Sequence, residues 1–524
     1  MHATNLPRPS IWLPCLVFVS IAIVYLVFAP NYEWTPEETG TAYGADFMQE
    51  WVGARMIVSG HVRELYDVDT FRAWQYNPKI VGFQWETDQY FPPVYPPPHY
   101  VLFSPFACLS YRWAVVCWLL VLISAAFLSA KVIADIANHS ASKGNPESLA
   151  DTQSKSTYLW LGLILFPSLL FSITLGQKSV CWLLLVCLTW RLLQSHRDYA
   201  AGMVFGVLSI KPTLFFLMPL VMLRNGRWRF FAGASLSVCI IWGATACLVP
   251  IDTWMAFAKV LSTAGNYAEN AGYRLDWSCN LMTMAYSLPP GLTEWCKWAI
   301  CMPLSIYLLY CVFEDRHYAV DSPEKALMLL GSTILISPHT YHYDLCVLLL
   351  PILWLVATST QRGIAYFAIL AIGVAVAGNI QDYFHVPILP IMLVGIVCEL
   401  RLRGVLRTVA DAASVGSDAA MVGSDASSVG SDAAMVGSDA SSIGSDAAMV
   451  GSDASSVGSD AAMVGSDASS IRHGVLKFLP LSALRFPCFA GTMSQSPSGQ
   501  DIESDIPPAL RAIQIEAISL RDLF

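Results

Sequence analysis

Long apolar runs recur along this chain from Ile11 to about Leu400, and they constrain its fold more than any other feature. Of its 524 residues, 55% are hydrophobic and 13% are charged, a balance too apolar for a soluble protein of this size. Inside a bilayer the backbone must satisfy its own hydrogen bonds, so helices are the expected spanning elements. The alternating pattern of a membrane β-barrel is absent from the sequence. The chain is therefore predicted to be an all-α polytopic membrane protein.

The apolar runs predict about 10 to 12 transmembrane helices. The first run, Ile11–Ala29, is interpreted as a membrane helix rather than a cleavable signal, because the residues that follow it are not small. Several later runs are shorter than the ~20 residues that a full crossing needs. Short spans beside polar loops are typical of a protein with a cavity inside the membrane. The predicted membrane domain covers residues 1–405.

The first large polar loop, residues 30–96, is expected on the outer side of the membrane. It holds ten acidic and four basic side chains, and a shortage of Lys and Arg is typical of non-cytoplasmic loops. The N-terminus is then cytoplasmic. Trp51, Ala54 and Val58 recur at helical spacing, which predicts a helix lying at the interface. Prolines over residues 91–98 favour an extended backbone before the next span.

Near the start of this loop stands the tetrapeptide Gly44-Ala45-Asp46-Phe47. A carboxylate held beside a membrane can act as a general base on a substrate hydroxyl. Taken by itself, Asp46 is more simply explained as a surface residue of an acidic loop. Its assignment to a site therefore depends on the polar clusters elsewhere in the chain.

Four further polar clusters interrupt the apolar runs, namely Gly176-Gln177-Lys178-Ser179, Lys211-Pro212, Ser278-Cys279-Asn280-Leu281 and the stretch from Ser337 to Asp344. Each of them also fits an ordinary helix turn or cap. Ionisable groups at membrane depth are costly and tend to be functional, which favours a role for Lys211 and His342. The third cluster lies in a second loop, residues 250–297, whose aromatic side chains suit the membrane interface and also suit stacking on sugars.

The stretch around Lys211-Pro212 has basic residues on both sides. The flanking groups are Arg191, His196 and Arg197 before it, and Arg224, Arg227 and Arg229 after it. The positive-inside tendency would place both groups in the cytoplasm, which a single crossing cannot do. Two half-helices that meet at Lys211-Pro212 would explain the pattern and would put the lysine at membrane depth. A kinked span with one basic group outside is the alternative.

An acidic heptad repeat, built on Gly-Ser-Asp, occupies residues 411–471. Asp411 and the repeat carry nine negative charges without a Lys or Arg between them, and the rest of the chain is balanced. The net charge of −9 therefore describes this segment and not the membrane domain. Small, acidic and repetitive, the segment cannot bury enough surface to fold and is predicted to be a disordered spacer. Residues 472–524 form a C-terminal tail.

The motifs of soluble nucleotide-binding and hydrolytic enzymes are missing from the sequence. It contains no Walker loop, no GxGxxG after a strand, no HExxH and no GxSxG. We therefore expect no nucleotide fold and no nucleic-acid partner. Whatever chemistry the protein carries out is expected within or at the membrane.

Taken together, the polar clusters resemble glycosyltransferase family 87, a branch of the C-type (GT-C) membrane glycosyltransferases. The similarity runs from about residue 10 to residue 403. It rests on Asp46-Phe47, Trp51, Ala54-Arg55, Gly60, Leu65-Tyr66-Asp67, Tyr95-Pro96-Pro97, Gly176-Gln177, Ala201-Gly202, Lys211-Pro212, Ser337-Pro338 and His342-Tyr343. The resemblance implies a GT-C-type fold. It also implies transfer of a hexose, typically mannose, from a polyprenyl-phosphate sugar to a glycolipid or glycan acceptor at the outer face of a plasma membrane.

The resemblance also implies that Asp46 is the catalytic base of an inverting transfer. Charge that develops on the departing phosphate needs cationic or hydrogen-bonding groups nearby. The residues expected to bind the donor phosphate or the substrates are Lys211, His342, Gln177, His339, Tyr95 and Asn280. The lipid-linked donor is a co-substrate, and no other cofactor is predicted. No metal site is predicted either, although Glu50, Asp67 and Asp69 are the acids that would serve a divalent cation.

Three other interpretations stay open at this point. A secondary transporter would also have broken helices and a buried Lys or His, although the two halves of the chain show no internal repeat. An O-antigen ligase or polymerase would also use lipid-phosphate sugars, but such enzymes usually carry their chemistry in a late loop. A structural or assembly protein could use the acidic repeat as a tether.

Overall fold

The computed structural model describes residues 44–83, 90–142, 159–270 apart from 161, and 278–410 apart from 316, 338, 359, 385 and 409. The chain divides into two units, Met1–Asp411 and Ala412–Phe524, and all described residues belong to the first unit. The expected first span Ile11–Ala29, the acidic repeat and the C-terminal tail lie outside the described residues.

The described chain is almost wholly helical, as the apolar sequence predicts. The early elements are α2 (Ala45–Val58), η1 (Val62–Glu64), α3 (Val68–Tyr76), α4 (Pro78–Val81), α5 (Pro97–Ala107), α6 (Tyr111–Ser142), α8 (Pro167–Thr174), α9 (Ser179–Gln194) and α10 (Asp198–Gly206). They are followed by η2 (Val207–Ile210), α11 (Pro212–Phe215), α12 (Leu217–Arg224), α13 (Trp228–Leu248), α14 (Ile251–Asn270), α15 (Met282–Tyr286) and α16 (Pro290–Cys296). The late elements are η4 (Lys297–Cys301), α17 (Met302–Glu314), α18 (Pro323–Ile336), η5 (His342–Leu348), α19 (Leu349–Thr358), α20 (Thr360–Phe384) and a final helix over 388–408.

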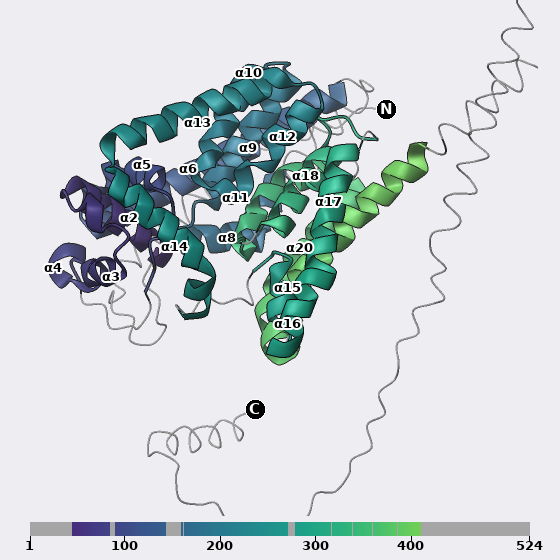
Figure 1. The fold of residues 1–524 in the computed structure, drawn as a ribbon. Helices are drawn as coiled ribbons and strands as arrows, with labels where there is room; N and C mark the ends of the chain where they lie inside the picture. Colours follow the sequence, from purple (N-terminus) through teal and green to yellow (C-terminus); the bar gives the residue numbers. More distant parts are fainter. Residues whose placement is uncertain are drawn as a thin grey trace, which may run out of the picture. The chain divides into compact units, whose positions relative to one another are not determined.

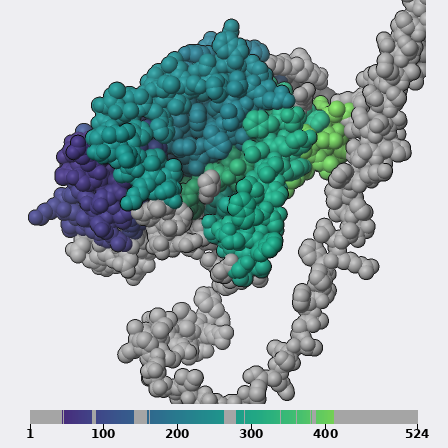
Figure 2. Space-filling model, viewed as in Figure 1, coloured from purple at the N-terminus to yellow at the C-terminus, as the bar shows by residue number. Residues whose placement is uncertain are grey.

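Three stretches of the described chain are long and apolar enough to cross a membrane, namely Tyr111–Ser140, Trp228–Leu248 and Gly291–Glu314. Shorter apolar helices accompany them, so the expectation of spans below the full crossing length is confirmed. Leu236, Ile240 and Leu248 of α13 are exposed apolar side chains, as expected for a helix that faces lipid. Figure 2 shows α13 in the outer layer of the face in view. The total number of spans stays a prediction.

Helices α6 and α9 run in the same direction and define the two ends of the helical unit. Near their beginnings, the Trp118 indole donates a hydrogen bond of 2.7 Å to the Gly176 carbonyl. Near their ends, the Gln194 amide donates one of 3.0 Å to the Ser140 hydroxyl. Ion pairs gather at the second end, among them Arg227 with Asp198 at 3.0 Å. We call this second end the arginine-rich end; its arginines include Arg191, Arg197, Arg224, Arg227, Arg229, Arg362, Arg401 and Arg403.

The segment around Lys211 enters from the arginine-rich end and returns to it. Helix α10 begins at Asp198, the helical path breaks at Lys211, and α12 ends at Arg224. The ion pair between Arg227 and Asp198 places the beginning and the end of this segment together. The prediction of two half-helices is therefore confirmed, and the alternative of a kinked full span is wrong. Pro212 at the first position of α11 explains the break, because proline cannot continue the preceding hydrogen-bond ladder.

Glycines let α10 pack closely against α13. A Cβ atom at Gly202 would overlap the Phe230 carbonyl, and one at Gly233 would overlap the Tyr199 carbonyl. Small residues at such crossings allow membrane helices to approach by their backbones. Figure 1 shows the two helices side by side.

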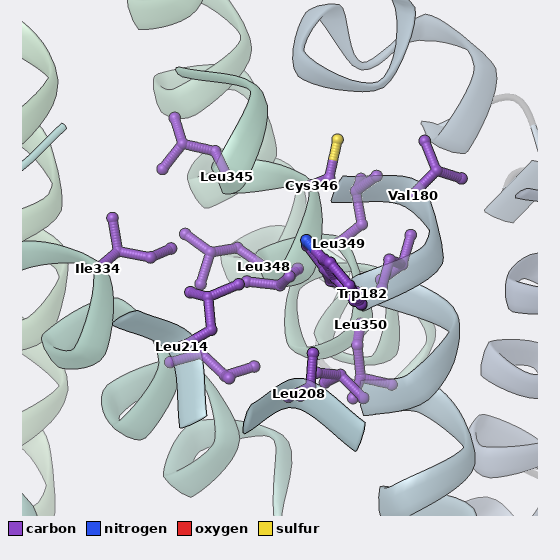
Figure 3. Close-up of a cluster of buried hydrophobic side chains, with 14 of the residues drawn as sticks. Val180, Trp182, Leu208, Leu214, Ile334, Leu345, Cys346, Leu348, Leu349 and Leu350 are labelled. Atoms are coloured by element: carbon purple, nitrogen blue, oxygen red, sulfur yellow. The ribbon is translucent and has the colours of Figure 1, made fainter. Parts of the chain in front are cut away.

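An apolar cluster packs around the tip of the broken segment, and Figure 3 shows it. Its labelled members come from α9, the broken segment, α18 and the η5–α19 turn; they are Val180, Trp182, Leu208, Leu214, Ile334, Leu345, Cys346, Leu348, Leu349 and Leu350. Close packing of these side chains joins four parts of the chain and holds the tip of the broken segment, with Lys211, in place.

The first loop folds into α2, η1, α3 and α4, and α2 packs against α5 (Figure 1). The predicted helix containing Trp51 and Ala54 is confirmed as α2, but it is not an amphipathic surface helix. Phe47, Trp51 and Ala54 are all buried, because α5 and the start of α6 cover them. The extended backbone expected over residues 91–98 ends at Pro96, and Pro97 and Pro98 are helical because proline fits the first turn of α5.

Candidate functional site

Two glycines bring the first loop against the turn between α8 and α9. Gly44 (φ 64°) precedes α2, and Gly176 (φ 71°) lies in the turn. A Cβ atom at Gly176 would lie 3.1 Å from the Cα of Gly44, so the two backbones are in direct contact. The Tyr111 hydroxyl of α6 donates a hydrogen bond of 3.0 Å to the Gly44 carbonyl and secures this contact. Asp46 is thereby held beside the residue that follows Gly176.

Each of the three residues after Gly176 binds one carboxylate. The contacts are a hydrogen bond from Gln177 to Asp46, an ion pair between Lys178 and Glu50, and a hydrogen bond of 2.9 Å from Ser179 to Asp344. These partners lie 131, 128 and 165 residues apart in the sequence. The turn is therefore the point where α2, α9 and η5 meet.

Asp46 is the acid with the environment of a general base. The side chain is half-buried, and burial raises its pKa from 3.8 to about 6. The nearby Glu50 carboxylate raises this pKa further, while the Gln177 hydrogen bond and the charge of Lys178 lower it. Gln177 engages Oδ2, and Oδ1 makes no hydrogen bond with the described residues. A carboxylate that titrates near neutral pH with one oxygen available suits proton abstraction from a hydroxyl.

Glu50 lies one turn along α2 from Asp46 and is buried. Its Oε1 contacts both Lys178 and, at 3.3 Å, the His99 ring of α5. Burial alone would raise the pKa of Glu50, but Lys178 and His99 outweigh this effect and hold it below its usual range. Tyr95 completes the group: its ring stacks on His99 with centroids 4.1 Å apart.

Lys211 emerges at the tip of the broken segment and forms a buried ion pair with Asp344. Asp344 is held in turn by the Ser179 hydroxyl and by the backbone N–H of Tyr341, at 2.9 and 3.1 Å. The Nζ of Lys211 also lies 5.7 Å from the centroid of the Tyr343 ring. This second ion pair belongs to the same polar region, because the Ser179 hydroxyl that binds Asp344 follows Lys178, the partner of Glu50, in the chain.

Four of the residues expected from the sequence thus lie together: Asp46, Gln177, Tyr95 and Lys211. His342 is buried at the start of η5, with its ring 4.8 Å from Phe171 and 5.4 Å from Tyr343. His339 is half-buried, and its ring lies 5.9 Å from that of Tyr341. Their roles toward a substrate stay predictions.

Asn280 has a local structural role at a turn, which was the alternative that the sequence left open for its cluster. Its Oδ1 accepts the Thr283 N–H at 3.1 Å, at the start of α15, and its amide donates to Ser278 at 2.8 Å. The Ser278 hydroxyl and the Cys279 N–H both donate to the Thr340 carbonyl, at 3.0 and 2.9 Å. The second loop is therefore tied to the turn that carries Asp344. Binding of substrate by Asn280 stays a prediction.

Sequence reasoning missed Lys178, His99 and Asp344 as members of the site. Lys178 and Asp344 stood inside two of the polar clusters, next to residues that were chosen, so their position in an apolar context was the available signal. His99 follows the proline stretch and carried no such signal.

The acids that would serve a divalent cation do not converge. Glu50 is paired with Lys178, whereas Asp67 is exposed and accepts the Thr70 N–H at 2.8 Å as the cap of α3. Among the described residues, no three His, Cys, Asp or Glu side chains form a group able to hold a metal ion.

The fold and the site define a polytopic helical membrane protein with buried acids and lysines gathered at the end opposite the arginine-rich end. The model of glycosyltransferase family 87 matches residues 94–338, so this segment is similar to the membrane glycosyltransferases of that family. The matched segment includes Tyr95, Lys178 and Lys211, while Asp46 precedes it and Asp344 follows it. Comparisons with curated proteins and with solved structures each found no match.

Proposed function

We propose that this membrane glycosyltransferase moves a hexose, mannose by its resemblance to the family, from a polyprenyl-phosphate sugar to a glycolipid or glycan acceptor. The observation that carries the proposal is the Asp46 carboxylate, whose pKa is raised to about 6 and whose Oδ2 is oriented by Gln177. The donor brings its own phosphate to the membrane in lipid-linked form. This would explain why the sequence shows no nucleotide-binding motif.

The proposed reaction is an inverting displacement at the sugar's anomeric carbon. Asp46 Oδ1 takes the proton of the acceptor hydroxyl as the new bond from that oxygen to the anomeric carbon forms. The bond from the anomeric carbon to the phosphate oxygen breaks, and polyprenyl phosphate leaves with the electron pair. Gln177 keeps the carboxylate in place during the transfer.

The departing phosphate needs positive charge or hydrogen-bond donors close to it. Lys211 supplies an ammonium at the tip of the broken segment, in the same polar region as Asp46. The further candidates for this role are His339, in the turn before η5, and His342, at the start of η5. Tyr95 lies beside the carboxylates, with His99 and Lys178 packed against its ring, so its hydroxyl is the group it would offer to a substrate.

Arginines are more numerous at the arginine-rich end than at the site end, which holds Arg55, Arg63, Arg72 and Arg112, and this excess supports an outward-facing site in a plasma membrane. Short turns at the arginine-rich end carry Arg197, Arg224 and Arg227, and such residues are retained on the cytoplasmic side. Asp46 lies at the opposite end, beside the beginnings of α6 and α9. A lipid-linked donor at the outer face would therefore meet Asp46.

The proposal is tested by incubating the purified protein with a radiolabelled polyprenyl-phosphate mannose and envelope glycolipid acceptors. Asp46→Asn should lower the rate of transfer by about 10²- to 10⁴-fold, the usual contribution of a general base, and leave binding of the donor intact. The matched control is Asp67→Asn, an exposed acid of the same loop whose capping role asparagine can also fill. It should transfer at the normal rate.

Equal loss of transfer in both variants would count against a specific role for Asp46. A transporter would be favoured instead by two results together. The unaltered protein would transfer no sugar, and it would take up a solute into proteoliposomes at a rate that Asp46→Asn does not change.

A further inference from the structure

Lys178 is a buried cation with unfilled hydrogen-bonding capacity. Its side chain is 2% exposed, yet it pairs with one acceptor atom, Oε1 of Glu50. Its Nζ lies 4.1 Å from the centroid of the Tyr95 ring, which attracts the charge but accepts no conventional hydrogen bond. An ammonium group has three N–H donors, so two of them have no acceptor among the described residues.

Lys211 has the same kind of surroundings as Lys178, namely one carboxylate and one tyrosine ring. It is 6% exposed, pairs with Asp344 Oδ1, and lies near the Tyr343 ring. The same Asp344 oxygen accepts the hydroxyl of Ser179, the residue next to Lys178. The two lysines, which are separate in the sequence, are therefore joined through Ser179 and Asp344 into one polar region.

Each of the two buried lysines has a buried carboxylate as its counter-ion. Glu50 compensates Lys178, and Asp344 compensates Lys211. Each carboxylate occupies one donor of its lysine and leaves the others for a third group. A phosphate group offers several acceptor oxygens around one centre and binds such donors by charge-assisted hydrogen bonds. The first turn of α9, which begins at Ser179, adds backbone N–H groups and a favourable dipole.

We propose that Lys178 and Lys211 together bind the phosphate of the lipid-linked donor, with Lys178 as a second phosphate ligand beside Lys211. This inference rests on the proposed function. Glu50 and Asp344 act as positioning residues that hold the two ammonium groups on either side of the phosphate. Gln177, which binds Asp46, and Lys178 are neighbours in one turn. A phosphate bound by Lys178 would therefore place its attached anomeric carbon beside the Asp46 carboxylate.

The experiment measures binding of radiolabelled polyprenyl phosphate, without sugar, to the purified full-length protein in lipid nanodiscs. Lys178→Met should weaken binding by about 10-fold or more, the usual effect of losing a charge-assisted hydrogen bond. Lys178→Arg keeps the charge and should bind within about threefold of the unaltered protein. Uncharged polyprenol of the same length, which lacks the phosphate, should bind all variants equally.

The matched control is Lys325→Met. Lys325 is also a buried lysine with a buried acid, Asp315, at 3.1 Å, but it lies at the arginine-rich end. It should leave polyprenyl-phosphate binding unchanged, whatever it does to thermal stability. Lys178→Gln serves in place of Lys178→Met if the latter does not fold.

Two results would overturn the inference and leave the proposed function standing. One is normal polyprenyl-phosphate binding by the folded neutral variants of Lys178. The other is a loss that is equally large for polyprenol, since the phosphate would then have no part in it. If the unaltered protein binds no polyprenyl phosphate at all, the proposed function fails together with the inference.

Discussion

Asp46 titrates close to neutral pH because it is desolvated, and this has a measurable consequence for activity. A general base works only when ionised, so the rate should be constant well above pH 6 and should fall as the pH drops through about 6. An ordinary aspartate, with a pKa of 3.8, would place this decline well below the working range. The measurement is kcat/KM for transfer across about pH 4 to 8.

Gln177→Leu should move this acidic decline to higher pH, since the Gln177 hydrogen bond lowers the pKa of Asp46. Gln75→Leu is the control: Gln75 is also a buried glutamine, but it donates its hydrogen bond, of 2.6 Å, to the Phe91 carbonyl. An unchanged decline in Gln177→Leu would show that a different group titrates.

At the residue scale the sequence predicted individual side chains better than their partners. Asp46, Gln177 and Lys211 stood out as polar residues in an apolar chain. Their electrostatic partners did not, because Lys178 and Glu50 are 128 residues apart and only the tertiary fold brings them together. A polar residue in such a chain can bind nearby backbone, as Asn280 binds the Thr283 N–H, or face a substrate, and only the tertiary contacts distinguish the two.

At the scale of elements, the packing of α10 against α13 depends on glycine at the contact. Gly233→Ala would push a methyl group into the Tyr199 carbonyl, so the two helices must separate. We expect the free energy of unfolding to fall by about 1–3 kcal/mol. Gly243→Ala, on the same helix, adds its methyl group in open space and should be neutral or stabilising by about 0.5–1 kcal/mol. Thermal unfolding of the purified variants measures both.

Equal stability of the Gly233→Ala and Gly243→Ala variants would contradict the close contact between α10 and α13. The comparison controls for helix propensity, since both substitutions replace glycine by alanine within α13.

The sequence also predicted the broken segment, because proline chemistry and the placement of arginine are local signals. Lys211-Pro212 marked the break, and basic residues on both sides indicated that the chain turns back. The burial of α2 was not predictable in this way. Spacing shows that Trp51 and Ala54 share a helix face, but it does not show that α5 and α6 cover the other faces as well.

At the scale of the whole molecule, the described unit separates a charged site from an arginine-rich end across a layer of apolar helices. The buried side chains of α9, α18 and the η5–α19 turn fill the space between them. Asp344 and Lys325 illustrate the separation: each belongs to a buried ion pair, one at either end. Sidedness of this kind is what transfer between membrane-bound substrates on one face of a bilayer requires.

Deletion of residues 411–524 should leave kcat and KM for transfer within about twofold of the full-length values, because every site residue lies between Asp46 and Asp344. The last described helix, 388–408, must be kept. Its residues Leu393 and Val397 are buried, and both lie against Gly331 of α18. A second truncation after residue 387 is therefore the control, and it should lose thermal stability and activity together. An inactive but stably folded protein truncated after residue 410 would show that the acidic repeat or the tail takes part in catalysis.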